Sequence, residues 1–317
     1  MTWVAWRRQR TETLIAAGIF TVLALALVPT GIEMASAYHH DGLSACLGAN
    51  TSFSCGGAID SFTSRFDRLN NFVSWLTLIP GLFGVLLAAP FVLELENGTY
   101  RLAWTQSITR RRWIAQKLGV AVGVALVVAL ALTLLVTWWR TPYVHLQGRM
   151  DSSVYDSEGI VVFGYTLFAL GLATAIGVVW RRAVPALVTG FAGYFVGRIF
   201  VDTWLRQRLL TPLRVRWPFA SPEPAVLQHA WTINQQIVGG AGRSIPKPAA
   251  MCGAPSPKVF DKAHIASCFA RHGVHMQALY QPASRFWPLQ GIETGMFAGT
   301  ALALLLFAAW WTHERAG

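Results

Sequence analysis

The chain has 317 residues, of which 54% are hydrophobic and only 13% are charged. Soluble domains carry about 25% charged residues, so this composition excludes an ordinary soluble protein and indicates a membrane protein. The formal net charge of +11 is compatible with a nucleic-acid partner, but we expect none, because the basic residues stand in short clusters beside apolar runs and no nucleic-acid-binding motif accompanies them.

Six segments are long and apolar enough to cross a lipid bilayer, which takes about 20 residues in a helix. We expect all six to be helices, because a lone strand would leave its backbone groups unpaired in lipid. The segments are Leu14–Ile32, Phe72–Leu93, Leu118–Trp139, Ile160–Trp180, Ala183–Trp204 and Gln290–Trp311. No convincing cleavage site accompanies the first, so we interpret it as a retained span rather than a signal peptide. The sequence therefore predicts an all-α polytopic membrane protein.

Basic residues gather on one side of the predicted spans. They precede the first span, follow the second and fourth, and close the chain, at Arg7, Arg8, Arg10, Arg101, Arg110, Arg111, Arg112, Lys117, Arg181, Arg182 and Arg315. Short loops rich in Arg and Lys face the cytoplasm. We therefore expect both termini in the cytoplasm. Residues 1–204 would hold five spans, 205–289 an extracellular subdomain, and 290–317 the sixth span with a cytoplasmic tail.

All four cysteines fall in predicted outer loops, Cys46 and Cys55 in the first, Cys252 and Cys268 in the last. An oxidising exterior permits disulfides, and four cysteines allow three pairings. Pairing within each loop is the natural one, and closing a loop of about 15 residues contributes up to about 3 kcal/mol. Four free thiols are the alternative. A metal site is disfavoured, because the spacing of these cysteines and the nearby histidines fits no standard zinc pattern.

The stretch ELENGTYRLAWTQSITRRRWIAQK joins the second and third predicted spans. Glu94 and Glu96 fall just past the end of the second span, and the following Asn-Gly pair is a turn signal. Thr99 can cap a short helix over Tyr100–Ser107 that lies at the membrane surface, and the arginines after it suit anionic headgroups. An ordinary loop between spans explains the arginines. It does not explain why two acids, a turn and a short apolar helix follow one another in this order.

This order resembles the permease subunits of type-2 ABC exporters. In that family an acidic residue, a variable residue and Gly-Thr follow the second span, and a short coupling helix and a basic segment ending in Lys come next. The matching residues here are Glu96, Gly98, Thr99, the helix over Tyr100–Ser107, Arg110 and Lys117. The six-span layout, with a large outer element before the last span, matches as well. More narrowly, ELENGTYRLAWTQSITRRRW and YQPASRFWPLQGIE resemble a group of compact actinobacterial ABC permeases.

The resemblance implies the membrane-spanning permease subunit of an ATP-driven exporter in a bacterial plasma membrane. The coupling helix, residues 96–110, would dock on a separate ABC ATP-binding subunit, of which the complex holds two copies. A second permease subunit, identical or related, would complete a dimeric helix bundle that moves substrate outward. The residues that the resemblance assigns to coupling are Glu94, Glu96, Gly98, Thr99, Arg101, Trp104 and Arg110.

The chain carries no phosphate-binding loop of the G-x-x-x-x-G-K-[ST] type. We therefore expect no cofactor and no catalytic residue in this chain, with ATP and magnesium held by the partner subunit.

Charged residues also occur in the fifth and sixth predicted spans. Arg198 and Asp202 are four residues apart and so share one helical face. We favour an intrahelical pair that reaches the outer membrane surface. The alternative is a polar lining of an outer gate, with Glu293 as a third member. Both interpretations place these charges near the outer edge of the bilayer.

The run YQPASRFWPLQGIE leads into the sixth span. Its aromatic residues Tyr280, Phe286 and Trp287 anchor the chain at the outer membrane surface or form a lid over the exit path, and the two roles are compatible.

Glycines recur every fourth residue in two spans, at Gly291, Gly295 and Gly299 in the sixth and at Gly193 and Gly197 in the fifth. Small residues at this spacing let helices approach closely. We favour packing within the chain over an interface between subunits.

Two other classes of function fit a polytopic chain with an outer loop. One is a membrane-anchored sensor or scaffold whose extracellular loop binds a ligand. The other is a membrane-embedded enzyme, which lacks support because no Ser-His-Asp or Cys-His arrangement stands out. Dependence on a phosphate-loop ATPase separates the permease from both.

Overall fold

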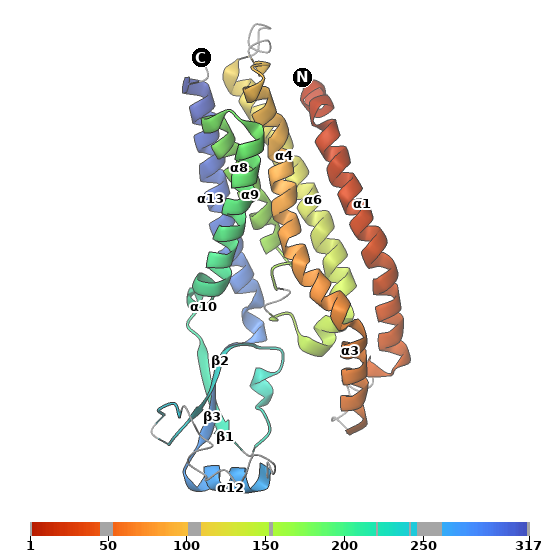
Figure 1. The fold of residues 1–317 in the computed structure, drawn as a ribbon, viewed down its shortest axis with the longest axis vertical. Coiled ribbons are helices and arrows are strands. Elements are labelled where there is room, and N and C mark those ends of the chain that lie inside the picture. The colour runs from red at the N-terminus through yellow and green to blue at the C-terminus, as the bar shows by residue number, and fades with distance from the viewer. Residues whose placement is uncertain are drawn as a thin grey trace.

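The computed structural model describes residues 2–44, 53–100, 109–151, 155–219, 221–240, 242–245 and 262–315. Long helices run side by side in a bundle, and a small lobe with a β-sheet lies beyond one end of it (Figure 1). Both chain termini lie at the opposite end of the bundle. We call that end the terminal end, and the end next to the lobe the sheet end.

Within the described residues, six helical segments are long and apolar enough to span a membrane, which confirms the six predicted spans. The helices that carry them are α1 (Thr2–His40), α4 (Ile79–Glu96), α6 (Arg110–Gln147), α8 (Val161–Trp180), α9 (Ala183–Phe200) and α13 (Phe286–Arg315). The fifth segment continues past α9 through a π-helical turn, η2 (Val201–Leu205), into α10 (Arg206–Leu209). With 38 residues, α6 is about 57 Å long and extends beyond the hydrocarbon core.

A further helix, α3 (Phe53–Trp75), lies in the first predicted outer loop and leads through a short 3₁₀ turn, η1 (Leu76–Leu78), into α4. The hydropathy pattern did not reveal it, because its sequence mixes apolar and charged residues. Phe62 and Phe66 on one face are buried against the sheet-end halves of α1 and α6. The helix is therefore an amphipathic extension of the bundle rather than an irregular loop.

Helices α4 and α8 form the centre of the bundle (Figure 1). In each, 72% of the apolar 18-residue stretch that could cross the membrane is buried inside the protein. The corresponding share is 22% in the spans of α1, α9 and α13. Glycine permits this close packing. A Cβ added at Gly84 of α4 would collide with the carbonyl oxygen of Thr166 in α8, and one added at Gly171 would lie 3.0 Å from the carbonyl oxygen of Ala301 in α13. The central helix α8 thus meets two neighbours almost backbone to backbone.

Contrary to the prediction from the sequence, the glycine stripe of α13 does not pack against another described helix of the chain. Nothing lies within 4 Å of a Cβ added at Gly291, Gly295 or Gly299, so the prediction that this stripe packs within the chain is wrong. In α9 the prediction is confirmed, because Gly193 faces Leu172 and Gly197 faces Phe168. Helix α13 instead meets α8 through its other face, so its glycine stripe stays open.

The lobe holds a three-stranded antiparallel sheet in the order β1-β3-β2, with β1 (Leu213–Pro218), β2 (Trp231–Val238) and β3 (His275–Gln281). Short 3₁₀ turns, η3 (Ala225–Leu227) and η4 (Ala283–Arg285), and the helix α12 (Lys262–Arg271) complete its regular elements. The sequence did not predict this sheet, because residues 205–289 were expected only to form an extracellular subdomain of an all-α protein. Strand β1 lies at the edge, where proline is tolerated, and Pro218 ends it.

Cys55 in α3 and Cys268 in α12 are both disulfide-bonded. Cys46 and Cys252, their predicted partners, lie outside the described residues. The pairing within each loop therefore stays a prediction.

Candidate functional site

The end of α4 is fixed by a buried ion pair. Glu94 lies in its last turn, and its Oε1 is 2.5 Å from Nζ of Lys117 in α6. Less than a tenth of each side chain is exposed. A buried charge without its partner is costly, so the two side chains hold each other in place. Glu94 therefore joins α4 to α6 at the terminal end.

Glu96 makes a second connection, to α9. Its Oε2 accepts a hydrogen bond of 2.8 Å from the backbone N–H of Ala183, the first residue of that helix. The first N–H groups of a helix lack partners within it, and the helix dipole favours a negative charge there. Glu96 thus caps the start of a helix that lies 87 residues further along the chain.

A turn follows α4 at the predicted position. Gly98 has φ +66°, a left-handed conformation that glycine adopts without strain. The hydroxyl of Thr99 lies 3.5 Å from the carbonyl oxygen of Glu94, so it faces back toward α4. Tyr100 is buried and packs on Trp113 of α6, with ring centroids 6.5 Å apart. These contacts anchor the base of the predicted coupling helix.

The predicted coupling residues Arg101 and Trp104 lie outside the described residues. Arg110 begins α6, and its guanidinium lies 3.5 Å from the carbonyl oxygen of His313 near the end of α13. Arg181 donates to the carbonyl oxygen of Arg315 at 2.8 Å. Cations suit the last carbonyl groups of a helix, so the end of α13 is also tied to its neighbours.

A second group of charged and polar side chains, most of them buried, lies near the sheet end, and we call it the outer network. Its members come from the α6–α8 connection, α8, the fifth segment and α13, and are Asp156, Tyr165, Arg198, Asp202, Arg206 and Glu293. At its centre Arg206 forms ion pairs with Asp156 and Glu293, and its Nε is 2.9 Å from Oε2 of Glu293. The hydroxyl of Tyr165 lies 2.8 Å from Oδ1 of Asp156 and 2.5 Å from Oε1 of Glu293. Opposite charges therefore hold three separate segments together.

Arg198 and Asp202 do not form the predicted ion pair with each other. Arg198 forms an ion pair with Asp156, and Asp202 forms one with Arg206, at 2.5 Å. Two features explain the difference. The π-helical turn η2 begins between them and changes the helical phase, and the better-buried carboxylate of Asp156 faces Arg198. Both residues share one network with Glu293, as the alternative prediction grouped them, whereas their role as the lining of an outer gate stays a prediction.

Two further polar contacts surround the outer network. Nε of the fully buried Arg140 donates to Oε1 of Glu158 at 3.0 Å. Burial raises the pKa of Glu158, and the charge of Arg140 offsets part of this. Gln290 of α13 accepts from the N–H of Val161 at 2.8 Å and so caps the start of α8. Helices α6, α8 and α13 are thereby joined at the same level.

The three predicted aromatic residues lie in different surroundings. Phe286 is buried and packs edge-on against Tyr155, at 5.6 Å between centroids, and Tyr155 in turn lies 4.4 Å below the guanidinium of Arg206. Tyr280 packs in the sheet with Trp217 and takes no part in the outer network. Trp287 is 54% exposed, as a membrane anchor would be.

Sequence reasoning missed Asp156, Arg206 and Tyr165 as members of the outer network, and it missed Lys117 as the partner of Glu94. Two of them have a signal in the sequence. Asp156 stands four residues before the fourth span, and Arg206 follows Asp202 by one helical turn. A charged residue that adjoins an apolar span needs a partner, but the sequence does not show which residue that partner is.

Residues 17–206 match the profile of a family described as ABC-2 membrane transporter related. The match includes the end of α4, the start of α6 and the network residues of the fifth segment, and it covers more than half of the chain. No curated protein and no solved structure matches the chain. The chain therefore belongs to the ABC-2 membrane transporter related family, and as an ABC-2-type permease it is a multi-pass membrane protein with a role in transport.

Proposed function

We propose that this chain is the membrane-spanning subunit of an ATP-driven exporter, and that its segment 96–110 docks on a separate ATP-binding subunit. One observation carries the proposal: the two acids at the end of α4 connect it to two other helices, Glu94 to α6 and Glu96 to α9. A displacement of this segment by a partner would therefore move α4, α6 and α9 together. An ordinary loop between spans has no need of these connections.

The terminal end would face the cytoplasm. Exposed arginines surround it in the described residues, at Arg110, Arg111, Arg112, Arg181, Arg182 and Arg315. This agrees with the rule that short cytoplasmic flanks are rich in Arg and Lys. In this orientation a cytoplasmic ATPase reaches the coupling segment. The disulfide-bonded Cys55 of α3 and Cys268 of the lobe then lie outside, where disulfides persist.

Helix α9 provides the mechanical link between the two ends. It has 18 residues, about 27 Å, and starts at the N–H that Glu96 caps. Near its other end Arg198 enters the outer network, and Arg206 follows beyond η2. We assign the outer network to the outer gate: it is closed while its ion pairs are made, and a shift of α9 separates Arg198 and Arg206 from Asp156 and Glu293.

ATP would act by population shift. Two ATP-binding subunits that come together on binding ATP and magnesium favour the conformation in which the coupling segments are displaced, and hence the open outer gate. A second permease subunit would complete the pathway. The open glycine stripe of α13 supports such a subunit, because small exposed residues let a neighbouring helix approach closely.

The test is to tag the full chain, extract it gently from native membranes and identify what co-purifies in stoichiometric amount. We expect a phosphate-loop ATPase, and we expect Trp104→Ala to remove it. Trp287→Ala is the matched control, because that tryptophan is exposed at the opposite end of the bundle. A chain without an ATPase, under conditions in which other ABC complexes stay intact, would overturn the proposal.

A further inference from the structure

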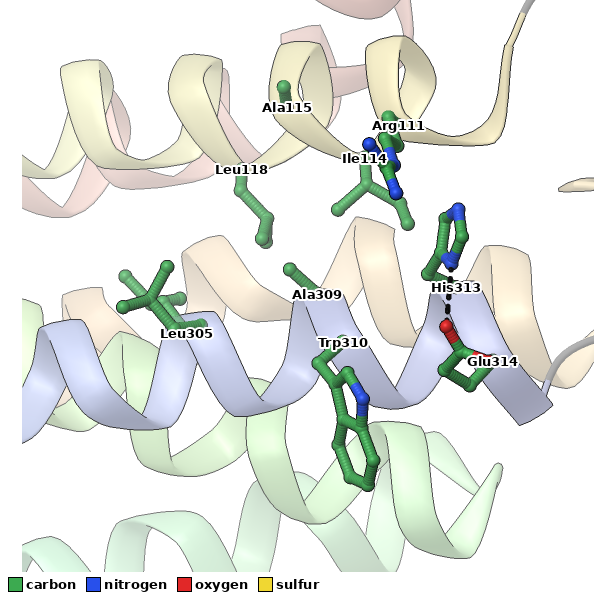
Figure 2. A pocket seen from close by; sticks show the side chains of 10 residues that line it. Arg111, Ile114, Ala115, Leu118, Leu305, Ala309, Trp310, His313 and Glu314 are labelled. Carbon is green, nitrogen blue, oxygen red and sulfur yellow. Dashed lines mark hydrogen bonds and ion pairs between the residues drawn. The ribbon is translucent and has the colours of Figure 1, made fainter.

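A groove lies between the first turns of α6 and the last turns of α13, at the terminal end (Figure 2). Its volume is about 490 Å³, and it is open to the outside of the bundle. The residues that line it are Arg111, Ile114, Ala115, Leu118, Leu305, Leu306, Ala309, Trp310, His313 and Glu314. It is distinct from the outer network, which lies near the other end of the molecule.

The walls of the groove are apolar along most of its length. Leu118 and Ile114 extend from α6 toward Leu305 and Ala309 of α13 (Figure 2). Leu306 is 61% exposed and Trp310 is 54% exposed, although both belong to a candidate membrane span. Such surface is suited to a hydrocarbon chain.

Arginines give the mouth of the groove its positive charge, because Arg111 lines it and Arg110 and Arg112 stand in the same turn of α6. Arg111 and His313 face each other across it from the two helices (Figure 2). Among the described residues that line the groove, Glu314 is the one acid, and its Oε1 lies 3.3 Å from Nδ1 of His313. The first turn of α6 contains three arginines and no acid, and the start of a helix attracts anions. Apolar walls below a cationic mouth are complementary to an amphiphile with a negative head.

We propose that this groove binds one anionic phospholipid. The phosphate lies at Arg111 and the first turn of α6, and an acyl chain follows the walls toward Leu118 and Leu305. A zwitterionic lipid fits the walls equally well but brings a positive group to a mouth that is already positive. The bound lipid joins α6 to α13 beside the base of the coupling segment, so it contributes to the rigidity of the terminal end.

The neighbouring arginine offers a matched control. Arg112 is in the same helical turn as Arg111 and is also exposed, but it does not line the groove. A general attraction between the basic surface and anionic membranes depends on both arginines alike. A site in the groove depends on Arg111 alone.

The experiment reconstitutes the full chain in vesicles of phosphatidylcholine and phosphatidylglycerol in equal amounts, extracts it and counts the retained lipids by native mass spectrometry. We expect phosphatidylglycerol to be retained in preference to phosphatidylcholine. Arg111→Gln should lower its retention about fivefold, the loss expected for one arginine at a membrane surface, and Arg112→Gln should leave it unchanged. Ala115→Trp, at an exposed position in the wall, should abolish retention by filling the groove.

Three results would overturn the proposal. Equal retention of the two lipids by the unchanged chain would show a groove without selectivity for charge. Equal losses in Arg111→Gln and Arg112→Gln would show attraction to the surface as a whole. Full retention in Ala115→Trp would place the lipid elsewhere.

Discussion

At the residue scale, the Glu94–Lys117 pair tests how the terminal end is held together. Removing one member leaves a buried charge alone, and the cost of this is about 3–5 kcal/mol. We therefore expect Lys117→Met to lower the thermal unfolding temperature of the detergent-solubilised chain clearly, and the double variant with Glu94→Gln to recover most of the loss. The measurement is thermal unfolding of the single and double variants.

The control for this pair is Arg65 and Glu33, which are 2.8 Å apart but more than half exposed. An exposed pair contributes about 0–1 kcal/mol, so Glu33→Gln should change the unfolding temperature little. If Lys117→Met has an effect as small as that of Glu33→Gln, the connection between α4 and α6 is not structural.

Glu96 should matter more for transport than for stability. Glu96→Arg removes the cap of α9 and places a positive charge at the positive end of that helix, which costs about 1 kcal/mol or somewhat more. That is small for a whole bundle, yet it breaks the contact between α4 and α9. We expect ATP hydrolysis by the reconstituted complex to continue while transport falls at least tenfold.

Glu223→Arg is the control for Glu96→Arg, because it reverses a charge on an exposed side chain of the lobe, away from the coupling segment and from the groove. It should leave both rates close to those of the unchanged complex. If transport survives Glu96→Arg, the coupling role assigned to Glu96 is wrong.

The sequence could predict which residues end α4 but not what they contact. Glu94 and Glu96 stand out because acids beside an apolar span are unusual. Their positions matched a family pattern, and the profile match confirms the family, whereas the coupling role of these residues stays a prediction. Their partners are 23 and 87 residues away and are fixed by the packing of three helices. The error over Arg198 and Asp202 has the same origin. Helical spacing predicted a local pair, whereas a π-helical turn and a buried aspartate from another segment decide the contacts.

At the scale of elements, substitutions at two glycines with opposite surroundings distinguish helix packing within the chain from helix packing between chains. Gly171 of α8 lies against the backbone of Ala301, whereas Gly295 of α13 faces open space. Gly171→Leu should force α8 and α13 apart and strongly lower the unfolding temperature of the isolated chain. Gly295→Leu should leave that temperature unchanged and weaken the association of permease subunits, measured by light scattering in detergent. A large loss of stability in Gly295→Leu would contradict the open stripe.

Hydropathy identified all six spans because a bilayer demands long apolar helices, and this demand is local in sequence. The elements outside the predicted spans lacked such a signal. Helix α3 is amphipathic and depends on burying Phe62 and Phe66 in the bundle. The three strands are short, and β3 lies between β1 and β2 although it is the last of them in the chain. Pairing between distant segments of this kind is not encoded in any single stretch.

At the scale of the whole molecule, α9 spans the distance between the assigned coupling segment and the outer network. The proposed mechanism requires that a change at Glu96 reaches the contacts of Arg198 and Arg206. Thr294 is a suitable reporter, because it follows Glu293 in α13 and its hydroxyl is buried without a hydrogen-bond partner in the described structure. A cysteine at this position is nearly isosteric, and Cys55 and Cys268 are disulfide-bonded and do not compete for a thiol reagent.

The most direct test is to label Thr294→Cys with a membrane-impermeant maleimide from the side of the lobe, in the reconstituted complex with its ATPase. If ATP binding opens the outer network through α9, the labelling rate rises severalfold on adding ATP and magnesium. The rise is lost when Glu96→Arg is added. A labelling rate that is the same with and without ATP, in a complex that hydrolyses ATP and transports, would contradict the account.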